Sequence, residues 1–328
     1  MGASGVAYAD ALMRAGRYPG GPKPPFIPGW DVLGIVEAVG SDIDPTLVGV
    51  PVLALLLTGG YAEVVTVPVE RVVRLPEGVS PQQAACLTMN YVTARQMLRL
   101  AGAAPGRRLL VHGAAGGVGS ALLDLARCQG IEAWGAASPS NRDRVESYGA
   151  RFIDRTLDDP GVQLKRAGYA GVDMVFDPLG GPNVRRSFAA LRPGGTVVSY
   201  GFMATPSGRP PLVTAILQMI ELRVRSLTSD GKRGVFYRLS NSVRADPAAF
   251  RADLGALLAL LADGRISPTL AGVLPLSQAA EAHRRLERGD VMGRLLLVPH
   301  PEQAARHPGP KERPRETLCG DERSCSPP

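Results

Sequence analysis

Four glycines in the stretch HGAAGGVG are the residues of this chain best suited to holding a ligand. Gly113 can adopt the backbone angles of a tight turn, and Gly116 and Gly117 let the backbone approach a diphosphate. Gly119 allows a helix to pack closely on a strand. A helix beginning in this turn directs free N–H groups and its positive dipole end toward a phosphate. A purely structural glycine turn is the alternative, because the spacing is GxxGxxG rather than GxGxxG.

The segments on either side of the turn favour nucleotide binding. Residues 109–111, Leu-Leu-Val, predict a strand buried on both faces. Val118, Leu122 and Leu125 recur at i, i+4 and i+7, which predicts a helix with one apolar stripe. A second predicted strand over 131–137 ends about 30 residues after the first begins, the length of one βαβ unit. Together these segments predict the opening of a dinucleotide-binding domain.

The end of that second strand indicates which cofactor is bound. A carboxylate there would bind the ribose of NAD and repel the additional phosphate of NADP. The chain instead has two alanines followed by Ser138, and then Asn141, Arg142 and Arg144, whose donors and charges suit a 2′-phosphate. The alternative is that these arginines belong to the solvated first turn of a helix. We expect the cofactor to be NADPH.

Length and composition limit the classes of protein to consider. The chain has 328 residues, 45% hydrophobic and 20% charged, typical of one large or two ordinary globular domains. It has neither an apolar run of roughly 20 residues nor a signal pattern, so a cytoplasmic protein without a membrane partner is expected. Four cysteines without a CxxC argue against a disulfide framework. The net charge of +7 is dispersed, which argues against a nucleic-acid partner.

Other patterns predict the elements around the turn. Residues 1–75 predict short strands without alternating helices, beginning at Trp30, Val50, Tyr61 and Glu70. A capping box, with Ser80 and Gln83 as its two members, predicts a long helix that ends near Leu100. Repeating βα units follow, with strands expected near Phe152 and over 172–176, 196–200 and 224–227. Helices over 247–262 and 277–288 and strands over 266–273 and 292–298 complete the predicted fold.

Several residues are expected at the carboxyl ends of these strands, where ligands bind to parallel sheets. They are Asp177, Gly180, Gly181 and Gly201. For Asp177, a helix-cap or loop carboxylate is the alternative to a ligand-binding role. Beyond Pro299 the chain is rich in Pro, Arg, Glu and Ser, which predicts disorder.

The motifs GVAYAD, RYPG, PGWDVLGIVEAVG, TARQML, VHGAAGGVG, FDPLGG, LRPGGTVVSYG and GDVMGRLLLV resemble one family in order and spacing. It is the medium-chain dehydrogenase/reductase superfamily, and the match is closest to its zinc-independent NADPH:quinone oxidoreductase (zeta-crystallin) type. The resemblance implies an α/β fold with a GroES-like catalytic domain over 1–80 and 246–298. It further implies a Rossmann NADP-binding domain over 81–245, a disordered tail over 299–328, and a homodimer.

The same family has further strands before GVAYAD. We therefore expect an N-terminally shortened first domain. The cause would be either a misplaced start codon or a lost edge that exposes unpaired strand groups.

The resemblance also places three residues where zinc-dependent relatives bind their catalytic metal. These are Ala7, Trp30 and Met89, none of which is an ordinary zinc ligand, so no metal is expected. Without a Lewis acid, hydride addition to a conjugated carbonyl is easier than reduction of a plain ketone, because the charge spreads into an enolate or hydroquinone. Ala7 also replaces a polar residue, often asparagine, found in many quinone reductases.

Tyr18, in RYPG, resembles a tyrosine discussed as a proton donor in enoyl reductases, and it is our predicted catalytic residue. Its alternative role is packing on Pro19 and Pro24. By its place in TARQML, Thr93 is expected to reach the nicotinamide amide, and Asn90 and Tyr91 either flank it or pack within a helix.

The predicted cofactor-binding residues are Asn90, Thr93, Gly113, Ala115, Gly116, Gly117, Val118, Gly119, Ser138, Asn141, Arg142, Gly201 and Phe202. The predicted function is a zinc-free NADPH-dependent oxidoreductase that transfers hydride to a small-molecule quinone or α,β-unsaturated carbonyl. Two alternatives stay open. One is an NADPH-binding regulatory or structural protein without significant turnover, and the other is a biosynthetic enoyl reductase acting on a carrier-bound acyl chain.

Overall fold

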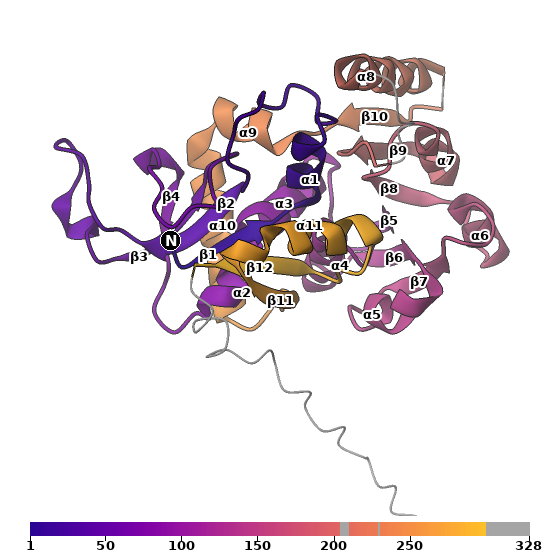
Figure 1. Cartoon of the computed structure of the whole chain (residues 1–328). Coiled ribbons are helices and arrows are strands. Elements are labelled where there is room, and N and C mark those ends of the chain that lie inside the picture. Colours follow the sequence, from indigo (N-terminus) through magenta and orange to yellow (C-terminus); the bar gives the residue numbers. More distant parts are fainter. Residues whose placement is uncertain (204–209, 229, 300–328) are drawn as a thin grey trace, which may run out of the picture.

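The computed structural model describes residues 1–203, 210–228 and 230–299. Apart from Pro299, the predicted tail lies outside the described residues. Two six-stranded sheets organise the described part of the chain and lie side by side in Figure 1. The predicted α/β architecture with a second, β-rich unit is confirmed.

One sheet is wholly parallel, with the strand order β10-β9-β8-β5-β6-β7. Its strands are β5 (Arg108–His112), β6 (Glu132–Ala137), β7 (Arg151–Asp154), β8 (Val172–Asp177), β9 (Leu191–Ser199) and β10 (Arg233–Phe236). Leu109, Leu110 and Val111 are completely buried, as the apolar run predicts. The chain runs from β5 outward to β7 and returns to β8 on the other side of β5. The carboxyl ends of β5 and β8 therefore form the switch point where ligands bind in such sheets.

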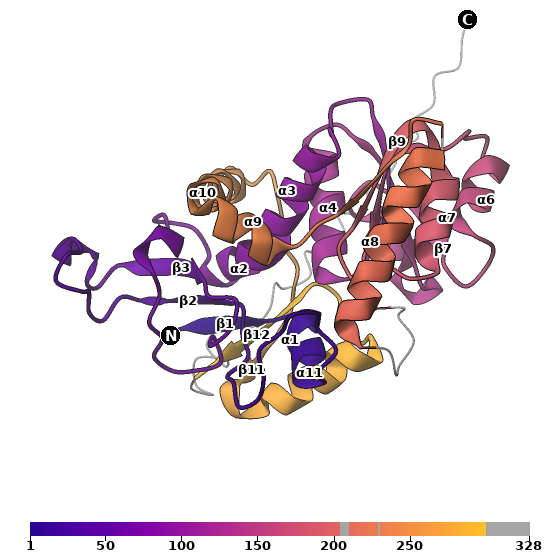
Figure 2. The same cartoon turned by 90° about the horizontal axis from the view of Figure 1, so that it is seen from above.

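Helices connect these strands. They are α4 (Gly117–Cys128), α5 (Arg142–Glu146), α6 (Pro160–Arg166), α7 (Asn183–Ala190) and α8 (Pro211–Thr228), with a 3₁₀ turn at Pro139–Asn141. The helix α4 packs on β5 and β6, α7 on β8 and β9, and α8 on β10. Figure 2 shows α6, α7 and α8 together in the right-hand part of the molecule.

The other sheet has the order β11-β12-β1-β2-β3-β4 and is antiparallel except between β11 and β12. Its strands are β1 (Ala3–Val6), β2 (Asp31–Ile35), β3 (Pro51–Leu55), β4 (Val72–Arg74), β11 (Leu270–Pro275) and β12 (Arg294–Val298). Ser4 of β1 lies opposite Leu297 of β12, so the first strand and the last are neighbours. Both ends of the described chain therefore build one unit around the same sheet. The proposed boundaries at residues 80, 245 and 298 stay predictions.

The remaining helices are α1 (Tyr8–Arg14), α2 (Pro81–Cys86), α3 (Val92–Leu100), α9 (Leu239–Ala245), α10 (Pro247–Ala262) and α11 (Ala279–Arg288), with 3₁₀ turns at Pro45–Leu47, Val69–Arg71 and Leu276–Gln278. The predicted helix from Ser80 to Leu100 is interrupted by a π-helical turn at Leu87–Tyr91. The predicted capping box does not form, because the Ser80 side chain makes no cap hydrogen bond.

Three further predictions were wrong in their local structure. The helix α1 occupies part of the segment predicted as strands alone, and the stretch from Tyr61 forms no strand. Residues 224–227 belong to the helix α8, and the strand β10 follows at Arg233. Residues 224–227 read Val-Arg-Ser-Leu, and four residues are too few to distinguish the period of a strand from that of a helix, which explains this error.

The glycine turn has the geometry that its sequence predicts. Gly113 has a φ of +64°, in the left-handed region that favours glycine. Gly116 is the N-cap residue of α4, with extended backbone angles. A Cβ atom on Gly119 would lie 2.2 Å from the carbonyl oxygen of Gly113, so only glycine lets α4 approach β5 this closely.

We expect Gly119→Ala to lower the free energy of unfolding by about 2–3 kcal/mol, because the added methyl group overpacks a backbone contact. Gly255→Ala is the matched control. It is also a glycine within a helix, but a Cβ atom there would meet no atom of the described residues within 4 Å. That control should gain about 0.5–1 kcal/mol from helix propensity. Urea denaturation of both variants measures the difference, and equal stabilities would contradict this explanation of Gly119.

Candidate functional site

A cleft of about 350 Å³ lies between the two sheets, at the carboxyl ends of the parallel strands. The glycine turn forms one wall, and segments that follow β1 and precede β2 form the other. Of the predicted site residues, the lining includes Tyr18, Asn90, Thr93, Gly113, Ala115, Gly116, Gly117, Val118, Gly119, Ser138, Asn141, Gly201 and Phe202. The structure thus brings these residues together, while their roles toward a cofactor or substrate stay predictions.

The glycine turn contacts the returning end of the chain. Gly293 donates its N–H to the carbonyl of Ala115, at 3.3 Å, and forms an isolated bridge with Gly116. A Cβ atom on Gly117 would lie 2.3 Å from Nδ2 of Asn90 and 3.1 Å from the carbonyl oxygen of Gly293. Gly117 therefore has a packing role between the two units that the sequence pattern alone does not reveal.

The π-helical turn brings Asn90 and Thr93 to the cleft. Asn90 is buried, and its Oδ1 accepts a hydrogen bond from Nη1 of Arg294 at 3.1 Å. The Thr93 hydroxyl is buried and has no hydrogen-bond partner among the described residues. Tyr91 is absent from the lining, and its hydroxyl donates to Asp124 at 2.8 Å. The structural alternative therefore holds for Tyr91.

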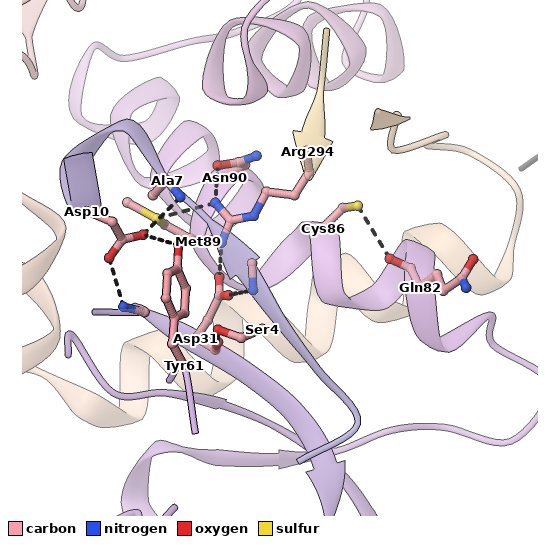
Figure 3. Close-up of polar contacts among 12 residues, drawn as sticks. Ser4, Ala7, Asp10, Asp31, Tyr61, Gln82, Cys86, Met89, Asn90 and Arg294 are labelled. Carbon is pink, nitrogen blue, oxygen red and sulfur yellow. Dashed lines mark hydrogen bonds and ion pairs between the residues drawn. The ribbon is translucent and has the colours of Figure 1, made fainter. Parts of the chain in front are cut away.

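A buried ion pair adjoins Asn90 at this wall, as Figure 3 shows. Nη2 of Arg294 donates to Oδ2 of Asp31 at 2.6 Å, and both side chains are only 2% exposed. Oδ1 of Asp31 accepts the N–H of Gly5 at 3.0 Å. Buried charges are tolerated when they are paired and hydrogen-bonded in this way. The pair connects β12, β2 and the π-helical turn.

Tyr18 is half-buried in the cleft wall and contacts both units. Its ring meets Trp30 edge to face, with centroids 5.9 Å apart. The guanidinium of Arg238, from the segment after β10, lies 5.2 Å from the centre of the Tyr18 ring and donates to the carbonyl of Pro19 at 2.9 Å. These contacts hold Tyr18 at the cleft.

The predicted phosphate end of the cleft differs from expectation at one residue. Arg142 is outside the lining, because its guanidinium lies over the Phe152 ring at 4.3 Å and pairs with Glu146 at 3.2 Å. Arg155 lines the cleft instead, beside Ser138 and Asn141. The backbone N–H of Arg155 donates to the carbonyl of Ala137, the last residue of β6, so Arg155 lies beside the end of that strand. The sequence contains the signal, since Arg155 follows the next predicted strand.

Two polar residues near the turn serve the structure. Oδ1 of Asp177 accepts the N–H groups of Leu179 and Gly180, at 2.8 and 3.2 Å, and its Oδ2 accepts from Ser187. The structural alternative for Asp177, a loop carboxylate, is therefore confirmed. His112 is buried beside Ser187, and burial lowers the pKa of its imidazole.

The three residues at metal-ligand positions of zinc-dependent relatives, Ala7, Trp30 and Met89, all line the cleft. Within the described ranges, no three His, Cys, Asp or Glu side chains gather in a group able to hold a metal ion. Sequence reasoning missed other parts of the lining, which come from the segment after β9, from the end of β10 and the residues after it, and from the returning end of the chain. They are Tyr200, Met203, Phe236, Tyr237, Arg238, Gly289, Val291, Gly293 and Arg294.

Comparisons with known proteins agree with this geometry. Residues 1–77 match the family model described as alcohol dehydrogenase GroES-like domain, and residues 149–297 match the one described as zinc-binding dehydrogenase. The synaptic vesicle membrane protein VAT-1 homolog of Rattus norvegicus is 33% identical over 307 residues, covering 92% of this chain and 76% of that protein. The Danio rerio homolog is 31% identical, and the aligned region covers 90% of this chain and only 63% of that relative's length.

Two solved structures are similar over the whole fold. The Escherichia coli quinone oxidoreductase complexed with NADPH has a TM-score of 0.80 at 26% identity, covering 91% of this chain and 90% of that one. The quinone oxidoreductase of Thermus thermophilus, also solved with NADPH, has a TM-score of 0.74 at 31% identity, covering 90% and 89%. The chain belongs to the medium-chain dehydrogenase/reductase superfamily, in its zinc-independent quinone oxidoreductase branch. None of its described helices combines the length and apolar character needed to cross a bilayer.

Proposed function

We propose that this protein is an NADPH-dependent reductase that transfers hydride to a quinone or an α,β-unsaturated carbonyl without a metal. The observation that carries the proposal is the cleft itself. It combines a phosphate-binding type of glycine turn with aromatic side chains that come from both walls. Structural relatives named as quinone oxidoreductases complexed with NADPH, and as the CurK enoyl reductase, support the same chemistry.

The residues present fit a nicotinamide dinucleotide. Gly116 at the start of α4 has open space at its Cβ position except for the Gly113 carbonyl oxygen at 3.3 Å, so a diphosphate can approach the backbone there. The Thr93 hydroxyl, which has no partner among the described residues, is a donor and acceptor suited to a carboxamide. Asn90 is held by Arg294 and lines the same part of the cleft.

The phosphate end favours NADPH over NADH. No carboxylate ends β6, where the chain has Ala137 and Ser138. Glu132 stands at the opposite end of that strand, 3.1 Å from the Arg108 guanidinium. Among the residues that the structure describes, the exposed Arg155 is the cationic side chain lining the cleft beside Ser138 and Asn141, and a guanidinium suits a phosphate monoester.

The aromatic lining of the cleft suits a flat conjugated substrate beside the cofactor. Aromatic residues are 5% of the chain, yet seven of them line this one cleft: Tyr8, Tyr18, Trp30, Tyr200, Phe202, Phe236 and Tyr237. Such walls stack on planar rings and exclude water. Bound NADPH supplies the hydride, and the protein's part is orientation and protonation. Tyr18 holds a phenolic proton at the cleft and is the proposed donor to the reduced product.

Two relatives bear on the location and the substrate. The VAT-1 relatives are named for the synaptic vesicle membrane, whereas we propose a cytoplasmic location for this protein. A component of pikromycin polyketide synthase is 31% identical over 301 residues, whereas we propose free quinones or enones rather than carrier-bound acyl chains as substrates.

The exposed apolar surface of the parallel-sheet unit supports the expected homodimer. One face of α8 is exposed and apolar, and the adjacent β10 is the edge strand of the parallel sheet. The exposed apolar residues are Leu212, Val213, Ile216, Leu217, Met219, Ile220, Val224 and Leu227. An apolar face of this kind beside an unpaired strand edge is typical of a subunit interface. We propose that α8 and β10 meet their counterparts across a two-fold axis.

The proposed activity predicts that purified protein oxidises NADPH when 1,4-naphthoquinone or an enone is added, and that added zinc does not raise the rate. Loss of absorbance at the reduced nicotinamide band measures the reaction. Binding of NADPH without consumption across a panel of quinones and enones would contradict the proposal and favour the non-catalytic alternative.

Arg155→Ala is expected to weaken NADPH binding by about tenfold or more while leaving NADH binding unchanged, because only NADPH carries the 2′-phosphate. Arg142→Ala is the matched control, since that guanidinium lies outside the lining and should leave both affinities unchanged. Fluorescence titration with each cofactor measures the affinities. If only Arg142→Ala weakened NADPH binding, the 2′-phosphate would be bound by Arg142, as the sequence predicts, and not by Arg155.

The interface proposal predicts a dimer in light scattering after size-exclusion chromatography, converted to a monomer by the double substitution Leu217→Glu and Ile220→Glu. The control is Leu157→Glu, at another exposed apolar residue away from α8, which should leave the dimer intact. A monomeric wild-type protein at micromolar concentration would rule the interface out.

A further inference from the structure

Asp10, in α1, is a completely buried carboxylate with no part in the chemistry described above. Its Oδ2 accepts the N–H of Ala7 and its Oδ1 accepts the N–H of Gly29, both at 2.9 Å. The Tyr61 hydroxyl donates to Oδ2 at 3.3 Å, and Figure 3 shows these groups converging on the carboxylate. One short side chain therefore connects two separate backbone segments.

Both segments form the acceptor side of the cleft. Ala7 lines it directly, and Gly29 precedes Trp30, which lines it and supports Tyr18. Gly29 has a φ of +103°, and a Cβ atom there would lie 2.7 Å from both Cα of Gly60 and Cδ1 of Tyr61. The backbone at Gly29 is therefore tightly packed, and the buried carboxylate of Asp10 accepts the Gly29 N–H.

A chain of side chains from the surface fixes the direction of hydrogen bonding at Asp10. Arg14 approaches Nδ1 of His283 at 3.4 Å and also pairs with Glu287. A guanidinium can only donate, so Nδ1 accepts and the proton of the neutral imidazole is on Nε2. Nε2 lies 3.2 Å from the Tyr61 hydroxyl, which therefore accepts from His283 and donates its own proton to Asp10.

We propose that Asp10 is a positioning residue for the acceptor side of the cleft, and that the chain from Arg14 through His283 and Tyr61 keeps its carboxylate in the form that accepts all three hydrogen bonds. Asparagine could not replace it, because one of the two oxygens would become a donor facing an N–H group. The inference deepens the proposed reductase function and rests on it for the kinetic effect, while the geometric effect is independent of activity.

The surroundings of Asp10 make this device sensitive to pH. Burial raises the pKa of Asp10 to about 6, against the lowering effects of the Gly29 and Ala7 N–H groups and of Arg294. Asp31 raises the pKa further. The nearby His283 has its pKa lowered by burial first and then by Arg14, opposed by Glu287, which favours its neutral form. Burial also raises the pKa of Tyr61, which keeps its proton.

The sign of the linkage follows from the raised pKa. Protonated Asp10 is favoured more in the folded protein than in the unfolded chain, so this group contributes stability at low pH that is lost as the pH rises through about 6. At neutral pH the ionised group is retained at a cost in stability. Below about pH 6 the fold gains stability from Asp10, but one oxygen no longer accepts, and the hold on Ala7 and Gly29 weakens.

Trp30 offers a readout that needs no enzyme activity. The chain has two tryptophans, Trp30 and Trp134, so Trp134→Phe leaves a single reporter next to Gly29. We expect the Trp30 emission of this variant to change with a midpoint near pH 6. Adding Asp10→Asn should remove the transition and give the low-pH spectrum throughout, whereas adding Asp42→Asn, an exposed aspartate, should leave it unchanged. A Trp30 signal that is constant between about pH 5 and 8, or a transition that survives Asp10→Asn, would overturn the inference.

Kinetics with 1,4-naphthoquinone test the positioning role. At neutral pH, Asp10→Asn should lower kcat/KM for the quinone about tenfold and leave the dissociation constant of NADPH unchanged, because the glycine turn is on the other wall. Wild-type protein should lose quinone activity with the same midpoint as the Trp30 transition. Unchanged quinone kinetics in Asp10→Asn, or an equal loss of NADPH affinity, would contradict a positioning role.

The two proposals can fail separately. If wild-type protein binds NADPH but reduces no acceptor, the proposed function fails, while the Trp30 titration still decides whether Asp10 holds the acceptor side of the cleft.

Discussion

The contact between the glycine turn and the returning end of the chain is the constraint on which the cleft depends. Gly293 bonds to Ala115 within the turn, and the next residue, Arg294, bonds to Asn90 and forms a buried ion pair with Asp31. Four segments far apart in the sequence are thereby fixed around one point. Replacing a buried pair by apolar residues is often neutral for stability, whereas removing one partner costs about 3–5 kcal/mol. The pair thus contributes mainly to the specific placement of the four segments.

The same constraint explains the interrupted helix before the turn. The helix that begins at Pro81 and ends at Leu100 contains a wider, π-helical turn at residues 87–91. This turn changes which of the following side chains face the cleft. Asn90 and Thr93 face the cleft while Tyr91 contacts Asp124 on the opposite side. Such turns are frequent at functional sites because they place side chains that a regular helix would turn away. The additional contact at Gly117 requires this placement of Asn90.

Local patterns predict the parts of the fold that depend on neighbouring residues. The buried strand at 109–111, the turn at Gly113 and the close approach at Gly119 each follow from a residue type and its spacing. Contacts between residues far apart in the sequence cannot be predicted from local patterns. Asp31 and Arg294 are 263 positions apart, and nothing in either motif indicates the pairing. Nearness in sequence to the end of β6 favours Arg142 over Arg155, although the parallel strand β7 brings Arg155 to the cleft. The sequence predicts a strand at the end of α8 because residues 224–227, Val-Arg-Ser-Leu, are too short a segment to show the helical period that the whole helix has.

In the proposed function the cleft provides orientation and a proton donor, and a dinucleotide bound on the glycine turn supplies the hydride. Calorimetric titration of folded protein with NADPH tests this claim most directly. We predict saturable binding of one NADPH per chain, with affinity greatly reduced by Gly116→Ala and thermal stability unchanged, since the added methyl group meets the incoming diphosphate and little of the protein. Absence of NADPH uptake by folded wild-type protein, or undiminished uptake by the variant, would contradict it.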